Sequence, residues 1–110
     1  DEDPVEPHDA WPDDMVLAEG LHRFEQAVTM PITRPIRSWA GLRSFTPDRT
    51  PVVGFDPAAD GFFWLAGQGG YGVQTAPALA AISAALCLGQ AVPVAPDIAS
   101  ALDPARFRPV

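Results

Sequence analysis

The stretch that decides the fold of this 110-residue chain runs Phe62-Phe63-Trp64-Leu65-Ala66-Gly67-Gln68-Gly69-Gly70-Tyr71-Gly72-Val73-Gln74-Thr75-Ala76-Pro77-Ala78. Its first five residues are all apolar, which is typical of a strand that is buried on both faces. Thr75 is a good N-cap and Pro77 is tolerated in the first turn of a helix, so we expect a helix there. Gly89 is a natural stop for that alanine-rich helix. One apolar face of the helix is made by Leu79, Ile82, Ala85 and Leu86.

The glycines between the strand and the helix allow three interpretations. Gly67, Gly69 and Gly72 fit the pattern GxGxxG, which in a dinucleotide-binding unit holds a pyrophosphate. That unit needs a second buried parallel strand, and the prolines within residues 92–97 exclude a central strand there. This missing strand makes pyrophosphate binding the least favoured interpretation. The other two are a turn without a ligand and a bare backbone that lies against a flat cofactor. We favour the cofactor, and expect that Gly69, Gly70 and Gly72 include positions with positive φ or without room for a Cβ.

The residues before this stretch predict a helix and a hairpin. Acidic residues at Pro12-Asp13-Asp14 suit a helix start, apolar residues follow at helical spacing, and Glu19 and Arg23 can pair along the helix. We expect a strand over residues 34–45, bent at Gly41, that pairs with a second strand over residues 52–55. Residues 47–51 and 56–61 have the composition of turns.

Composition excludes several classes of protein. Hydrophobic residues make up 47% of the chain and the net charge is −7, so a disordered chain is excluded and binding to nucleic acid is not expected. The single cysteine, Cys87, allows no intramolecular disulfide, and neither His8 nor His22 has partners at ligand spacing, so we expect no metal. No apolar run reaches the roughly 18 residues of a membrane span, and the acidic start is unlike a secretory signal. A cytoplasmic location follows as an expectation.

Four segments together resemble a known family. They are Trp39-Ala40-Gly41-Leu42-Arg43, Thr46-Pro47-Asp48, Pro51-Val52-Val53-Gly54 and the run from Gly61 to Ala78. In this order and spacing they resemble the C-terminal part of the FAD-dependent D-amino acid oxidase-like family, which includes glycine oxidases, sarcosine oxidases and D-amino acid dehydrogenases. The resemblance covers about residues 35–90.

The resemblance implies roles for particular residues. Arg43 matches an arginine that holds the substrate carboxylate, a task suited to a guanidinium fork. Residues 69–73 match the loop beside the flavin ring, and Thr75 with its helix matches the element that faces the pyrimidine edge. We expect Tyr71 to line both the substrate and the cofactor. The implied cofactor-binding set is Gly69, Gly70, Tyr71, Gly72, Val73, Gln74 and Thr75. No catalytic base is identified, and glycine stands at position 41, where relatives with covalent flavin have cysteine, so noncovalent FAD is expected.

The expected fold class is an α+β fragment with an N-terminal helix, a hairpin, a buried strand and a C-terminal alanine-rich helix. It divides into residues 1–30, an acidic lead-in and helix, residues 31–90, the flavin-facing segment, and residues 91–110, a loose proline-rich tail with a helical turn near residues 97–102. The implied function is oxidation of the C–N bond of a small amino acid or N-methyl amino acid by hydride transfer to flavin.

The family's dinucleotide fingerprint, which lies near the N-terminus of a much longer chain, is missing here. We therefore expect these 110 residues to be inactive alone and to bind no FAD alone. Residues 62–66 and the face of Leu79, Ile82 and Leu86 would then lack cover and favour self-association. The alternative function is a noncatalytic, self-associating module without a cofactor.

Overall fold

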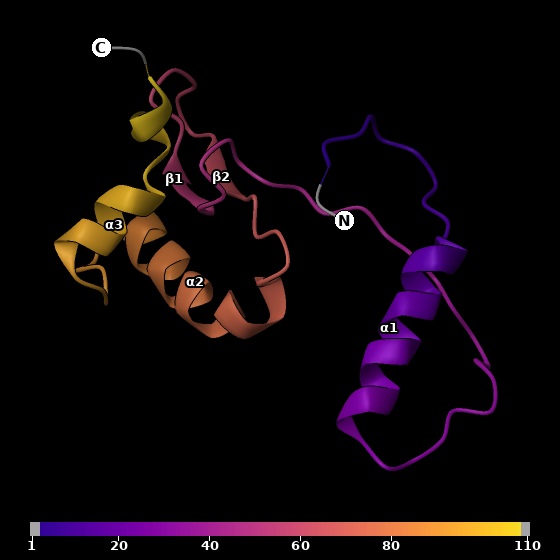
Figure 1. Ribbon diagram of the computed structural model, residues 1–110. Coiled ribbons are helices and arrows are strands. Elements are labelled where there is room, and N and C mark those ends of the chain that lie inside the picture. The colour runs from indigo at the N-terminus through magenta and orange to yellow at the C-terminus, as the bar shows by residue number, and fades with distance from the viewer. Residues whose placement is uncertain (1–2, 109–110) are drawn as a thin grey trace. The chain divides into compact units, whose positions relative to one another are not determined.

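The computed structural model describes residues 3–108, which fall into two compact units, residues 3–42 and 43–108 (Figure 1). The described residues form three α-helices, one short 3₁₀ helix and a two-stranded antiparallel sheet. The expected α+β class is confirmed. The lead-in and the tail also include residues 1, 2, 109 and 110, which lie outside the described residues. No helix among residues 3–108 is long and apolar enough to cross a membrane.

The first unit contains helix α1 (Asp14–Ala27). The predicted acidic helix start is confirmed, and Asp13 is the cap: its Oδ1 accepts from the backbone N–H groups of Met15 at 2.9 Å and Val16 at 3.0 Å. The Glu19–Arg23 ion pair is also confirmed. None of the residues of α1, all of which the structure describes, is buried. The apolar stripe of this helix therefore has no core of its own within the described residues.

The predicted strand over residues 34–45 is wrong. These residues have no strand assignment apart from an isolated antiparallel bridge between Phe45 and Gln68. The expected partner, β1 (Val52–Phe55), pairs instead with β2 (Phe63–Ala66), from Val52 opposite Ala66 to Phe55 opposite Phe63. A short connection brings β1 and β2 together at little entropic cost, whereas residues 34–44 find no strand partner among the described residues. The predicted turns over residues 47–51 and 56–61 are confirmed.

The sheet supplies one side of the core. Val53, Leu79, Ile82 and Leu102 form the buried cluster, because α2 and α3 both contact β1. The strand β2 is not buried on both faces as predicted, since Trp64 is 38% exposed and Leu65 is 46% exposed. Neighbouring residues of a strand point to opposite faces of the sheet, so both faces of β2 are partly open at this point. The expectation that the helix face lacks cover is wrong for Leu79 and Ile82, which are buried.

Helix α2 (Gly72–Cys87) begins earlier than the sequence predicted. Tyr71 is its N-cap residue, and Thr75 lies inside the helix, where its hydroxyl donates to the Tyr71 carbonyl at 2.7 Å. The predicted Thr75 cap is therefore wrong: the glycine loop is already helical at Gly72. The predicted stop is confirmed, because Gly89 has φ +63° and the N–H of Gln90 donates to the Ala85 carbonyl at 2.8 Å.

The C-terminal segment packs on the sheet. The predicted helical turn is confirmed as α3 (Pro96–Leu102), and the 3₁₀ helix η1 (Pro104–Phe107) follows it. Pro104 is buried against Gly54, where an added Cβ would lie 2.8 Å from the proline Cδ. Residues 96–107 are therefore not the loose tail that their prolines suggested, because two of those prolines begin helices.

Candidate functional site

The glycine loop connects β2 to α2. Gly69 has φ +54°, and a Cβ there would lie 2.8 Å from Cδ1 of the Phe45 ring. Gly67 has φ +71° and faces Thr46 in the same way. Gly70 has open space around it, and at Gly72 the nearest atom would be 3.4 Å away. The prediction that this glycine group includes a position with positive φ or without room for a Cβ is confirmed at Gly69.

The structure brings the Arg43 segment to this loop. The N–H of Gly69 donates to the carbonyl of Ser44 at 3.1 Å, beside the bridge between Phe45 and Gln68. Arg43 directly precedes Ser44 in the chain, so its backbone lies beside the same loop. Arg43 is exposed, so its guanidinium is available to a ligand. Two sequence elements predicted to share a site are therefore neighbours.

The start of α2 is open to a ligand. No side chain caps this helix, and Gly72, Val73 and Gln74 form its first turn. Tyr71 is 57% exposed and Val73 is 94% exposed. The first N–H groups of a helix carry partial positive charge, so this end can stabilise an anion or a negatively charged ring edge.

The topology decides against a pyrophosphate-binding unit. The strand before the loop is antiparallel to its neighbour, and within residues 3–108 no strand follows α2. A βαβ unit is therefore not formed by the described residues, although the letters GxGxxG are present. The open backbone at Gly70 and the uncapped helix fit the edge of a flavin ring, whereas the described residues do not form a dinucleotide fold.

A half-buried arginine that sequence reasoning missed contacts the turn that includes Asp48, Thr50 and Pro51. The guanidinium of Arg106, whose side chain is 15% exposed, donates from Nε to Oδ2 of Asp48 at 2.8 Å. Its Nη2 donates to the carbonyls of Thr50 at 2.7 Å and Pro51 at 3.2 Å. This hydrogen bond from Arg106 is the main reason that the pKa of Asp48 lies well below its usual value. Arg106 and Asp48 are 58 positions apart, so no local pattern signals the pair.

A second carboxylate shapes the hairpin turn. Asp56 accepts from Nε1 of Trp64 at 2.8 Å and from the backbone N–H groups of Ala58 and Ala59. The hydrogen bond from Trp64, followed by that from Ala58, lowers the pKa of Asp56. This contact orients the indole along the hairpin and belongs to the fold rather than to a binding site.

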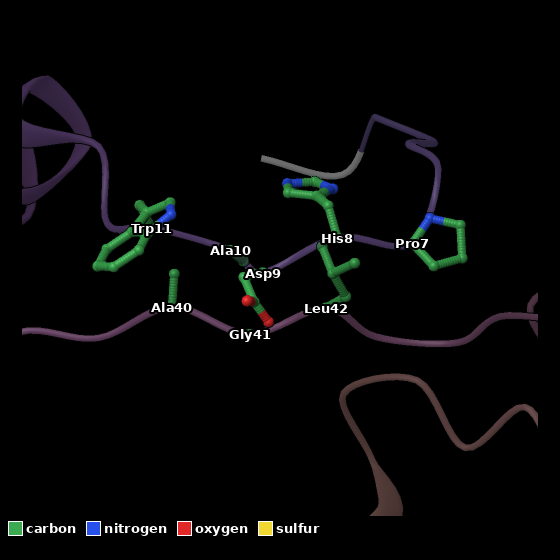
Figure 2. A pocket seen from close by; sticks show the side chains of 8 residues that line it. All are labelled: Pro7, His8, Asp9, Ala10, Trp11, Ala40, Gly41 and Leu42. Atoms are coloured by element: carbon green, nitrogen blue, oxygen red, sulfur yellow. The ribbon is translucent and has the colours of Figure 1, made fainter.

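The first unit has a hollow of its own. About 470 Å³ of open space lies between residues 7–11 and residues 40–42, and Figure 2 shows the Asp9 carboxylate directed toward Gly41 and the Trp11 ring beside Ala40. The hollow is broadly open to solvent. Gly41 is the position at which the resemblance implied noncovalent flavin, but the hollow contains no predicted site residue.

The comparison with protein families identifies the class. Residues 2–86 match the model of the family described as FAD dependent oxidoreductase. This match covers more than half of the chain, so the chain belongs to the FAD-dependent oxidoreductase family. The complete protein of such a family carries FAD.

Among curated proteins the chain is similar to bacterial tRNA 5-methylaminomethyl-2-thiouridine biosynthesis bifunctional proteins MnmC. It is 38% identical over 92 residues to that of Caulobacter sp. strain K31, which covers 83% of this chain and 15% of the relative. It is 33% identical over 106 residues to that of Acinetobacter baylyi, which covers 86% of this chain and 16% of the relative. The chain therefore spans about a sixth of the length of these relatives.

Proposed function

We propose that this chain is the flavin-facing and substrate-facing segment of a longer FAD-dependent oxidoreductase that oxidises a C–N bond of an amine. The observation that carries the proposal is the hydrogen bond from Gly69 to Ser44, which sets the Arg43 segment beside the glycine loop and the open start of α2. FAD, held noncovalently, supplies the hydride acceptor.

Each group has a role in this arrangement. The Arg43 guanidinium pairs bidentately with a substrate carboxylate and fixes the adjacent C–H bond in one orientation. The backbone of Gly69, Gly70 and Gly72 lies along the cofactor, and the first turn of α2, with Val73, Gln74 and Thr75, stabilises negative charge at its edge. Tyr71 is exposed at the same end and lines the space between cofactor and substrate.

The proposed substrate class combines two separate observations, the guanidinium of Arg43 and the names of the relatives. Arg43 suits a carboxylate, as in a small amino acid or N-methyl amino acid, while the names of the relatives concern a methylaminomethyl group on a tRNA uridine. Both are satisfied by an N-substituted amino acid whose nitrogen is attached to the methylene group of a uridine. Loss of a hydride from Cα and of the proton from nitrogen gives an imine, and water then splits it into the free amine and an oxo acid.

The charge of the chain limits where tRNA can bind. With a net charge of −7, these residues are poorly suited to contact a phosphate backbone. We therefore assign any tRNA contact to other parts of the complete protein. The expected absence of nucleic-acid binding by these residues, like the cytoplasmic location, stays a prediction.

The test is Arg43→Lys in the complete flavoprotein. Lysine keeps the charge but cannot form the guanidinium fork, so KM should rise by the equivalent of about 2 to 4 kcal/mol, on the order of 30- to 1,000-fold. Arg37→Lys is the matched control, since Arg37 is also exposed but has no place in the site. An unchanged KM for amino acid and aminomethyl-uridine substrates alike would remove Arg43 from the site.

A noncatalytic, self-associating module is the second candidate function. The observation in its favour is exposed apolar surface, since Val73 on α2 and Leu65 on β2 are exposed. The flavin absorbance spectrum of the complete protein distinguishes the two, because a module without a cofactor would show none. FAD titration of the 110-residue chain, followed by flavin fluorescence, and sedimentation then test what this segment does alone. We expect dimers or larger species and no saturable FAD binding at low micromolar concentration. Saturable binding would show that this segment holds a complete site.

A further inference from the structure

We propose that Arg106 is a positioning residue for the candidate site, which it serves through the turn at residues 46–51. We call Arg106 with its acceptors Asp48, Thr50 and Pro51 the Arg106 clamp. The inference rests on the proposed function. Arg106 lies outside residues 2–86, the part that matches the family model, so that match assigns it no role.

The clamp joins the C-terminal end of the second unit to the turn. Arg106 places two nitrogens on the Asp48 carboxylate, at 2.8 Å and 3.3 Å, and reaches the two backbone carbonyls of Thr50 and Pro51. The guanidinium of Arg106 is also held by its own segment, because Nη1 donates to the Asp103 carbonyl at 3.1 Å and the group stacks 4.1 Å from the centre of the Phe107 ring. A planar fork that uses several donors at once holds the turn in one geometry.

The turn at residues 46–51 also contacts the glycine loop. Thr46 Oγ1 lies 2.9 Å from Asp48 Oδ1 and 2.6 Å from the Thr50 carbonyl, so its side chain is fixed by the clamped residues. The methyl group of Thr46 lies against Gly67, at 2.7 Å from the place of a Cβ on that glycine. The next residue back, Phe45, places its ring over Gly69 and forms the bridge to Gln68.

The consequence concerns Arg43. Two residues before Phe45, it lies next to Ser44, whose carbonyl receives the Gly69 N–H. The clamp therefore sets the register between the proposed carboxylate-binding arginine and the proposed cofactor-facing loop. A chain without the clamp keeps the β1–β2 ladder and loses the definition of this register.

Hydrogen exchange on the 110-residue chain tests the clamp without any enzyme activity. In Arg106→Gln the Gly69 amide should exchange about tenfold faster, while the amides of the β1–β2 ladder stay within about twofold of the unmodified chain. In Arg106→Lys the exchange rate of the Gly69 amide should lie between those of the unmodified chain and Arg106→Gln. Arg108→Gln is the matched control, because Arg108 is exposed and two residues away. Equal acceleration at Gly69 and in the ladder, or none at Gly69, would overturn the proposal.

Asp48→Asn provides a second variant if Arg106→Gln does not fold. Asp48 is 43% exposed, so an amide there is tolerated, and it weakens the clamp by removing the charge. We expect an acceleration of about threefold at Gly69 with an unchanged ladder. No acceleration at Gly69 in this variant contradicts the clamp.

Kinetics of the complete flavoprotein test the positioning role. Arg106→Gln should raise KM for the amine substrate about tenfold, with kcat and the flavin absorbance spectrum unchanged, and Arg106→Lys should restore part of the loss. An unchanged KM together with faster exchange at Gly69 would refute positioning. If the unmodified flavoprotein oxidises no amine, the proposed function fails, and the exchange experiment still decides the clamp.

Discussion

The two units of this chain share one family match but differ in what holds them together. Residues 2–86 match the FAD-dependent oxidoreductase model across both units. Among the described residues, every buried residue lies at or after Val52, whereas the first unit has a capped helix without a buried side chain. The second unit therefore has a tertiary core, and the first has local structure without one.

This difference separates interactions that define a single helix from interactions that build a buried core. Local signals such as an N-cap and an i,i+4 ion pair define α1, but each of them contributes little free energy. In the second unit, α2 and α3 bury apolar side chains against β1, and burial is the larger contribution. The following predictions test this contrast, from the largest effect to the smallest.

The largest effect is expected in the core of the second unit. Ile82 is 3% exposed, and Ile82→Ala should destabilise that unit by about 2 to 5 kcal/mol through lost burial and an unfilled cavity. The matched change in the first unit is Leu21→Ala, since Leu21 is a half-buried residue of the α1 stripe. Urea unfolding followed by circular dichroism measures both. Equal losses would show that the first unit has a core as well.

The glycines of the two units should respond differently to alanine. Gly69→Ala places a Cβ at φ +54° under the Phe45 ring, so we expect a loss of about 1 to 2 kcal/mol in the second unit. Gly41→Ala in the first unit meets no atom within 4 Å and should cost nothing measurable. Gly70→Ala is the control within the loop itself, since its surroundings are open as well. Thermal unfolding measures all three, and a neutral Gly69→Ala would contradict the strained turn.

Removing the cap of α1 should affect the first unit alone. Asp13→Ala leaves the N–H groups of Met15 and Val16 without their carboxylate acceptor, at a cost of about 1 kcal/mol in helix stability. Far-ultraviolet circular dichroism should report less helix, while the unfolding midpoint of the second unit stays unchanged. A shift of that midpoint would reveal coupling between the units.

The smallest effect is an acid dependence of the second unit. The hydrogen bond from Arg106 lowers the pKa of Asp48 in the folded chain, and that from Trp64 lowers the pKa of Asp56. A lowered folded pKa stabilises the fold above the pKa of the unfolded carboxyl, near 3.9. That contribution decreases as the pH falls below about 4 and is lost below the folded pKa.

The acid dependence is measured by urea unfolding at pH 5 and at pH 3. We expect the second unit to lose stability at pH 3, and Asp48→Asn to lose less between the two pH values than the unmodified chain. Both carboxylates are close to solvent, so screening keeps the difference small. An identical pH dependence in Asp48→Asn would show that the clamp does not act through the charge of Asp48.

Short-range chemistry explains what could be predicted. The Asp13 cap, the Gly89 stop and the helical turn near residue 97 each depend on neighbours within a few positions. The four motifs that carried the family resemblance are likewise readable in order along the chain, and the family match confirms them. The roles of Arg43 and Tyr71 stay predictions, although the structure sets the Arg43 segment beside the glycine loop.

Partner choice explains what could not be predicted. The composition of residues 34–45 suits a strand, but a strand forms where another strand accepts its hydrogen bonds, and Val52–Phe55 pairs with Phe63–Ala66 instead. Thr75 is a sound cap by residue type, yet the backbone is helical from Gly72 onward. The exposure of Trp64 and Leu65 likewise depends on which elements cover the sheet, and a run of five apolar residues does not indicate that.

The sequence by itself determined the start of α1, the stop of α2 at Gly89, the turns, the glycine loop and the family, because caps, φ preferences and motifs are properties of adjacent residues. The tertiary structure alone decided which strands pair, where α2 starts and which side chains are buried. It alone joined Arg106 to Asp48 across 58 positions and set Ser44 against Gly69. Such contacts depend on the chain closing long loops, and their free energy becomes available once distant segments have met.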